Sequence, residues 1–223
     1  MVLFHILYDL NYFDVLKINF DTLFFQSYIY INATPFLLLV GVSLTLSYSK
    51  AKKTMTEKEI QKKFLVRGLK IFGYGLIITL VTWIYLPDGF IIFGILHCVG
   101  ISVIFAYPFL KLQKSSLGIG FSLVIAGVFL RFFIFDFYYL LWLGFIPAGF
   151  FTVDYFPLLP WFGVVLIGIF VGKKLYPNYK RSFHLNDMSE HRSVKILSFL
   201  GRHSLIIYLI HQPIILALIW LIF

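Results

Sequence analysis

Three histidines lie in long apolar stretches of the chain, where a side chain that can transfer protons is uncommon. His97 lies near the middle of the uncharged run of residues 90–110, and that run is long enough to cross a bilayer, which requires about 20 apolar residues. His5 and His211 also lie in apolar runs. Because ionisable groups inside a membrane are costly and commonly functional, we take all three as candidate catalytic residues. We expect the helices that carry them to bring polar groups together inside the membrane.

Asp9 follows His5 by four positions, so the two side chains are expected to share one face of a helix. A neutral imidazole accepts a proton from a hydroxyl or an amine, while a carboxylate fixes its tautomer and stabilises the imidazolium. His5 and Asp9 are therefore a candidate catalytic pair. The alternative interpretation is a buried polar pair that only ties two helices together.

His97 and His211 each have two interpretations. His97 is either a catalytic base or donor, or a histidine bonded to a backbone carbonyl that a nearby proline has freed. His211 precedes Gln212 and Pro213, and the proline can kink the helix and open a polar cavity, with Gln212 as a candidate substrate-binding residue. The alternative for His211 is a core histidine whose hydrogen bonds are satisfied.

Two further sets of residues suit substrate and cofactor binding. Asp154 and Trp161 flank the sequence PLLP, and they can hold a polar, sugar-like substrate by hydrogen bonding and ring stacking. The alternative for this pair is an ordinary interfacial aromatic belt. The basic residues Arg67, Lys70 and Lys173 can meet the phosphates of an anionic cofactor, although lipid contacts and membrane topology explain them as well.

The composition indicates a polytopic helical membrane protein. Hydrophobic residues make up 60% of the 223 and charged residues 13%, whereas a soluble domain has about 45–50% and about 25%. We predict an all-α bundle of six full spans and a partial first helix, about seven in all, in a single domain over residues 1–223. The partial helix falls within residues 1–12, and the spans are expected at residues 22–48, 64–86, 90–110, 117–135, 157–175 and after Ser204.

Other segments have patterns of their own. Residues 136–156 are rich in aromatic side chains and are predicted to form a short helix and a re-entrant or interfacial segment. Residues 193–200 are predicted to form an amphipathic turn or two along the interface. Within the span at 157–175, Gly168 and Gly172 form a G-x-x-x-G pair, which favours close packing against another helix.

The charged residues predict the orientation of the chain. The connections at residues 49–63 and 173–195, and the one that begins at Lys111, are basic, whereas those at 87–89 and 136–156 contain aspartate and no lysine or arginine. Under the positive-inside rule this alternation places the N-terminus in the cytoplasm. The net charge of +9 is explained by these connections and does not indicate a nucleic-acid partner. The single cysteine and the lack of a Cys/His pattern give no sign of a metal site.

Three stretches, FGILHCVGIS, DYFPLLPWFGVVLIGIFVGK and GRHSLIIYLIHQP, occur in this order and resemble the prokaryotic branch of the heparan-α-glucosaminide N-acetyltransferase catalytic-domain family. The N-terminal VLFHILYDLNYF and the later LLLVGVSLTLS fit the same pattern, so the resemblance covers nearly the whole chain. The segment L-D-x-x-R-G-x-A that usually precedes the family's first helix does not occur ahead of VLFHILYDLNYF here.

The resemblance implies a transferase of the prokaryotic cytoplasmic membrane that moves an acetyl group from acetyl-CoA to an amine or hydroxyl of a small-molecule or glycan acceptor. It implies that His5 matches an essential early histidine and that His211 fits the family pattern in the last helix. We expect His5, oriented by Asp9, to deprotonate the acceptor, with His97 and His211 positioning groups or stabilising the oxyanion. A transporter or permease for a small polar solute and a non-catalytic membrane subunit are the alternatives. The bilayer is an expected partner, and an oligomer is left open.

Overall fold

The computed structural model describes residues 2–19, 22–112, 115–184 and 186–222. Within these residues the chain forms α-helices, two 3₁₀ turns and isolated β-bridges, which confirms the predicted all-α class. The helices are α1 (Val2–Tyr12), α2 (Leu23–Ala51), α3 (Glu57–Tyr85), α4 (Ile95–Lys111), α5 (Ser115–Leu130), α6 (Leu158–Leu175), α7 (Arg192–Arg202) and α8 (Ser204–Ile222). The 3₁₀ turns are η1 (Leu141–Leu143) and η2 (Pro177–Tyr179).

Among the described residues, four helices are long and apolar enough to cross a membrane, namely α2, α3, α6 and α8. The helices α4 and α5 are apolar but shorter. With 11 residues, α1 matches the predicted partial first helix. The chain is therefore an integral membrane protein, whereas the total of about seven spans stays a prediction.

The basic connection between α2 and α3 is shorter than the predicted residues 49–63. A capping box starts α3 at Glu57: the Thr56 N–H donates to Glu59 Oε2 (2.7 Å), and the Glu59 N–H donates to the Thr56 hydroxyl (3.4 Å). This reciprocal pair satisfies two N–H groups that the first turn of a helix otherwise leaves without partners. The lysines that follow Glu59 are therefore helical and extend the apolar span at its end.

The chain divides into two compact units, which are described separately. Unit 1 comprises residues 1–32 and 184–223, and unit 2 comprises residues 33–183. The division falls inside α2, shortly before Pro35. A single domain over the whole chain stays a prediction.

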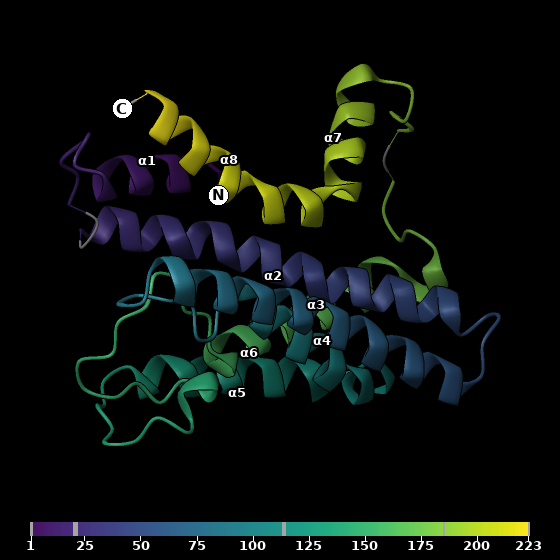
Figure 1. The fold of residues 1–223 in the computed structure, drawn as a ribbon. Helices are drawn as coiled ribbons and strands as arrows, with labels where there is room; N and C mark the ends of the chain where they lie inside the picture. The colour runs from purple at the N-terminus through teal and green to yellow at the C-terminus, as the bar shows by residue number, and fades with distance from the viewer. Residues whose placement is uncertain (1, 20–21, 113–114, 185, 223) are drawn as a thin grey trace. The chain divides into compact units, whose positions relative to one another are not determined.

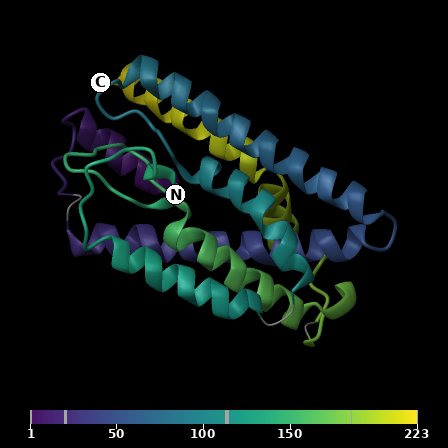
Figure 2. The same cartoon turned by 90° about the horizontal axis from the view of Figure 1, so that it is seen from below.

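In unit 2, α5 lies along α6 and α3 lies along α4 (Figures 1 and 2). The helix α6 also packs closely against α2. A Cβ atom added at Gly168 would lie 2.2 Å from the Leu38 carbonyl oxygen, and one added at Gly172 would lie 3.0 Å from the Thr45 side chain. The predicted role of this glycine pair in close helix packing is therefore confirmed.

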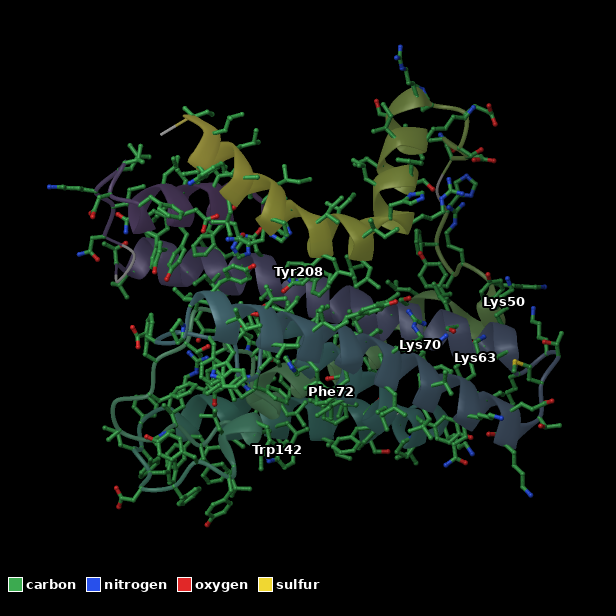
Figure 3. The ribbon with its side chains drawn as sticks, viewed as in Figure 1. Lys50, Lys63, Lys70, Phe72, Trp142 and Tyr208 are labelled. Carbon is green, nitrogen blue, oxygen red and sulfur yellow. The ribbon has the colours of Figure 1, made fainter. Side chains whose placement is uncertain are left out.

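Basic side chains gather at one end of unit 2. Glu57 at the start of α3 forms an ion pair with Lys111 at the end of α4, with 2.9 Å between the charged atoms. Figure 3 shows Lys50 and Lys63 near the connection between α2 and α3. The basic connections thus meet at the same end of the helices, as the positive-inside pattern requires, while the cytoplasmic orientation of that end stays a prediction.

The aromatic connection at residues 136–156 contains only η1 in place of the predicted short helix. Gly144 and Gly149 have φ angles of +125° and +70°, which interrupt any regular helix there. Farther along, the Val153 N–H donates to the Gly89 carbonyl of the connection after α3 (3.0 Å). These two connections therefore hold each other at the end of unit 2 opposite the basic one.

Unit 1 contains α1, α7, α8 and the first turns of α2, and α1 packs against α8. The helix α8 continues through Pro213, and Figure 1 shows it bending part-way along its length. Such a bend is expected where proline removes a helical hydrogen bond. The amphipathic segment predicted at residues 193–200 is α7, which is slightly longer than expected.

Candidate functional site

Two of the predicted histidines meet in unit 1. The packing of α1 against α8 brings the ring of His5 to the ring of His211, with 4.9 Å between centroids and 61° between ring planes. His211 is buried, with 8% of its surface exposed. Two imidazoles from opposite ends of the sequence therefore share one apolar environment.

The hydrogen bond of His211 determines which of its ring nitrogens can act as a base. Its Nδ1 lies 2.6 Å from the backbone carbonyl oxygen of Tyr208, one turn earlier on α8. A carbonyl oxygen only accepts hydrogen bonds, so Nδ1 carries the proton and the neutral ring leaves a lone pair on Nε2. Within the described part of the chain, this buried Nε2 atom has no hydrogen-bond partner. His211 is therefore held in the tautomer that a general base requires.

The next residue on α8 binds the carboxylate of α1. Gln212 Nε2 donates to both oxygens of Asp9, at 2.9 Å and 2.8 Å. This contact orients the amide, because a carboxylate accepts hydrogen bonds and the amide nitrogen must face it. Asp9 is thus bonded to Gln212, and no hydrogen bond to His5 occurs among the described atoms. The predicted pairing of His5 with Asp9 is replaced by contacts of each residue to α8.

Two acceptor atoms on neighbouring residues are left without donors. His211 Nε2 and Gln212 Oε1 are both buried and have no hydrogen-bond partner among the described residues. A buried polar group without a partner costs about 1–3 kcal/mol, so native proteins rarely leave such atoms unpaired. An N–H or O–H donor would satisfy either atom. An amine, a hydroxyl or a water molecule has this chemistry.

His97 is held differently, in unit 2. Its Nδ1 accepts a hydrogen bond from the Gly94 N–H (3.2 Å), so the proton of the neutral ring lies on Nε2. Nε2 in turn lies 3.3 Å from the Thr79 hydroxyl, which donates to the Ile91 carbonyl (2.6 Å). Both ring nitrogens of this buried residue are therefore engaged. His97 ties the start of α4 to α3 and to the connection between them.

Aromatic and small side chains enclose the His97 ring. Phe72, labelled in Figure 3, meets it edge-on with 5.2 Å between centroids. Phe93 stacks on it with 5.5 Å between centroids. On α3, Gly75 leaves room for the ring, because a Cβ atom there would lie 3.0 Å from the imidazole. The surroundings of His97 are those of a tightly packed core residue.

Asp154, in the aromatic connection, contacts the start of α4 near His97. Its Oδ2 accepts a hydrogen bond from the Ile95 N–H (3.1 Å), in the first turn of α4. The carboxylate approaches so closely because residue 94 is glycine: a Cβ atom there would lie 2.2 Å from Oδ2. Burial raises the pKa of Asp154 to about 6, and the hydrogen bond from Ile95 partly opposes this rise. The Asp154 oxygen satisfies one of the N–H groups that the first turn of α4 otherwise leaves without a partner.

Trp161, the other predicted substrate-binding residue, is buried at 3% exposure near the start of α6. Its ring packs at an angle on Phe156, with 5.2 Å between centroids. The predicted partners of a sugar-like substrate thus form internal contacts: Trp161 within the core and Asp154 at the start of α4.

The predicted phosphate-binding residues fall into two groups. Lys173 Nζ donates to the carbonyl oxygens of Phe109 (3.0 Å) and Leu112, so it caps the C-terminal end of α4. Arg67 and Lys70 are exposed on α3. These two remain accessible to an anionic ligand.

No cluster of three or more His, Cys, Asp or Glu side chains suited to a metal ion occurs in the described ranges.

Some partners of the site had no signal in the sequence. Thr79 is an ordinary helical threonine by its context, and its contact with His97 depends on how α3 packs on α4. Tyr208 lies one turn before His211 in the sequence, but it acts through its backbone carbonyl, which every residue possesses. Gln212 was identified as a substrate-binding candidate, whereas its bond to Asp9 joins positions 203 residues apart.

Comparison with known proteins gives one match. The family model described as heparan-alpha-glucosaminide N-acetyltransferase, catalytic, matches residues 1–213, which is nearly the whole chain. Neither the curated proteins nor the solved structures contain a match.

Proposed function

Because the chain belongs to the heparan-alpha-glucosaminide N-acetyltransferase catalytic family, we propose that it transfers an acetyl group from acetyl-CoA to an amine or hydroxyl of a sugar-like acceptor. The family indicates a membrane acetyltransferase in general terms. The observation that carries the proposal further is the buried Nε2 of His211, whose ring contacts that of His5 and which has no hydrogen-bond partner within the described residues.

In this proposal His211 is the general base. The acceptor gives the proton of its N–H or O–H to His211 Nε2 while its nitrogen or oxygen bonds to the acetyl carbonyl carbon. The C–S bond then breaks, and the CoA thiolate leaves and takes up a proton. The Tyr208 carbonyl keeps accepting the Nδ1–H throughout, so it holds the ring in place as the imidazolium forms.

The other three polar groups of unit 1 position the reaction. Gln212 Oε1 accepts a hydrogen bond from the acceptor, and Asp9 fixes the amide that presents this atom. His5, in ring contact with His211, is the second imidazole of the site and a carrier for the proton that His211 releases. The role of base expected for His5 thus passes to His211, while Arg67 and Lys70 are proposed for the phosphates of acetyl-CoA.

The proposal is tested with purified protein, acetyl-CoA labelled in its acetyl group, and a panel of amino sugars, simple amines and neutral sugars. The wild type is expected to label at least one acceptor, and His211→Gln is expected to lower kcat by about 10²–10⁴, the usual contribution of a general base. His184→Gln is the matched control, because His184 is an exposed histidine outside the helices of the site.

Two results would count against the proposal. Full turnover by His211→Gln would show that His211 is not the general base, although the protein would still be an acetyltransferase. No label on any acceptor, together with uptake of a polar solute into vesicles containing the protein, would favour the transporter instead. Gln212→Glu adds a further check, since a second carboxylate beside Asp9 is expected to disrupt the contact between α1 and α8.

A further inference from the structure

The helix α7 exposes an apolar face that the rest of the described chain does not cover. Ile196, Leu197, Phe199 and Leu200 are 51%, 68%, 56% and 45% exposed. With 3.6 residues per turn these four side chains fall on one side of the helix, and Lys195, Ser198 and Arg202 fall on the other. Four large apolar side chains on an 11-residue helix are unfavourable in water, so this face requires an apolar environment.

The polar face of α7 is basic. Lys195 and Arg202 lie on this face, Arg192 is the first residue of the helix, and the helix contains no acidic residue. Lys195 forms an ion pair with Glu190, which precedes the helix and is itself 90% exposed at its side chain, so this pair is open to solvent. The face therefore keeps a positive charge. A basic helix with an apolar side suits the surface of a bilayer, where negatively charged headgroups lie over the apolar acyl chains.

The position of α7 next to α8 in the chain places it at the membrane surface. A single residue, His203, separates the end of α7 from the start of α8, and α8 is a candidate membrane span. One residue extends less than about 4 Å, so the last turn of α7 lies where α8 meets the membrane surface. Figure 1 shows α7 running across the direction of the adjoining part of α8. A helix that runs across a spanning helix at its end lies along the surface of the bilayer.

We propose that α7 is an interfacial helix that binds anionic phospholipid. Its apolar side chains enter the boundary between headgroups and acyl chains, and its arginines and lysine contact the lipid phosphates. This anchor also fixes the depth of α8. His211 lies seven residues after Ser204, so the proposed base is held about 10 Å below the level of α7 at a rise of 1.5 Å per residue.

The test uses the full-length chain with a photo-reactive amino acid in place of Leu197 or Ser198, on the apolar and polar faces of the same helix. Each protein is reconstituted in vesicles of phosphatidylcholine alone or mixed with phosphatidylglycerol, illuminated, and analysed by intact mass. Leu197 is expected to give a lipid adduct, with at least about a twofold higher yield than Ser198 because only the apolar face enters the membrane. Phosphatidylglycerol is expected to be enriched in the adduct over its share of the vesicle.

A charge variant separates lipid selection from simple insertion. Arg192→Gln, Lys195→Gln and Arg202→Gln together are expected to abolish the enrichment of phosphatidylglycerol while the adduct at position 197 persists. Peptide adducts at Leu197 in place of lipid adducts would overturn the proposal, since the face would then be covered by another part of this chain or by a second copy. Equal adducts from both lipids in the wild type would overturn the selectivity for anionic lipid.

Discussion

At the scale of single residues, the role of a histidine depends on what each ring nitrogen contacts. His97 uses Nδ1 as an acceptor from Gly94 and Nε2 as a donor to Thr79. His211 donates from Nδ1 to Tyr208 and keeps a lone pair at Nε2. Both residues are buried, yet among the described residues only His211 of this pair has a ring nitrogen without a hydrogen-bond partner, which can accept a proton.

Asp154 gives a pH dependence at the same scale. The pKa of its carboxyl is raised by burial to about 6, above its value of about 3.9 in an unfolded chain. The folded state therefore binds more protons between these values, so stability is greatest below about pH 4 and falls as pH rises through 6. The loss is at most about 3 kcal/mol, because each pKa unit corresponds to about 1.4 kcal/mol.

The variant Asp154→Asn is expected to remove this dependence. Its Oδ1 can still accept the hydrogen bond from Ile95, but the side chain does not ionise. The measurement is the melting temperature of both proteins in detergent at pH 4 and at pH 8. The difference, variant minus wild type, should be larger at pH 8 than at pH 4. Asp88→Asn, in the connection after α3, is the control. A difference between variant and wild type that is the same at both pH values would contradict the assignment.

At the scale of the helices, close backbone approach between α6 and α2 gives a second stability prediction. Gly168→Ala places a Cβ atom 2.2 Å from the Leu38 carbonyl oxygen, so the two helices must separate. We expect a loss of about 1–3 kcal/mol, the usual cost of overpacking a core. In contrast, Gly73→Ala on α3 meets nothing within 4 Å and should be neutral or stabilise by up to about 1 kcal/mol.

The measurement is thermal unfolding of the two variants in the same detergent. Equal melting temperatures for Gly168→Ala and Gly73→Ala would show that α6 does not approach α2 as closely as the structure indicates. This pair is a controlled comparison, because both substitutions are glycine to alanine within long apolar helices.

The helices were predictable to different degrees because their signals differ in range. Apolar runs and the pair of Gly168 and Gly172 are local patterns, and they gave the all-α class and the close packing of α6. The start of α3 was missed because lysines indicate a loop, whereas the capping box at Thr56 and Glu59 makes the segment helical. The short helix expected within residues 136–156 is limited to the three residues of η1, which ends at Gly144, where φ is positive.

The candidate site was predictable as a set of residue types but not as a set of pairs. Rare ionisable residues in apolar runs pointed to His5, Asp9 and His211, and these do gather in unit 1. Helical spacing suggested that His5 contacts Asp9, but both side chains face α8 and find partners there. Such pairings depend on the rotation of one helix against another, which sequence spacing within a helix does not determine.

At the scale of the whole molecule, charge is distributed unevenly, and this distribution bears on cofactor binding. The ends of α2, α3, α4 and α6 at the basic end of unit 2 contain most of its lysines, several of which have structural partners. Lys111 pairs with Glu57, and Lys173 caps α4. Arg67 and Lys70 extend farther along α3 than the other basic residues and are exposed. A cation placed in an apolar span without an acidic partner is costly, which favours a binding role for this pair.

We therefore expect the double variant Arg67→Gln and Lys70→Gln to raise the KM for acetyl-CoA about tenfold, which corresponds to about 1.4 kcal/mol of lost phosphate contact. The kcat should change little, because neither residue takes part in proton transfer. Lys58→Gln with Lys62→Gln, also exposed on α3, removes the same charge nearer the end of the helix and is the matched control. The KM for acetyl-CoA is measured for both pairs at low and moderate salt. An equal rise in KM for both double variants would show that net charge attracts the cofactor to the membrane surface. A rise confined to the Arg67 and Lys70 variant would place the phosphates of acetyl-CoA at these two residues.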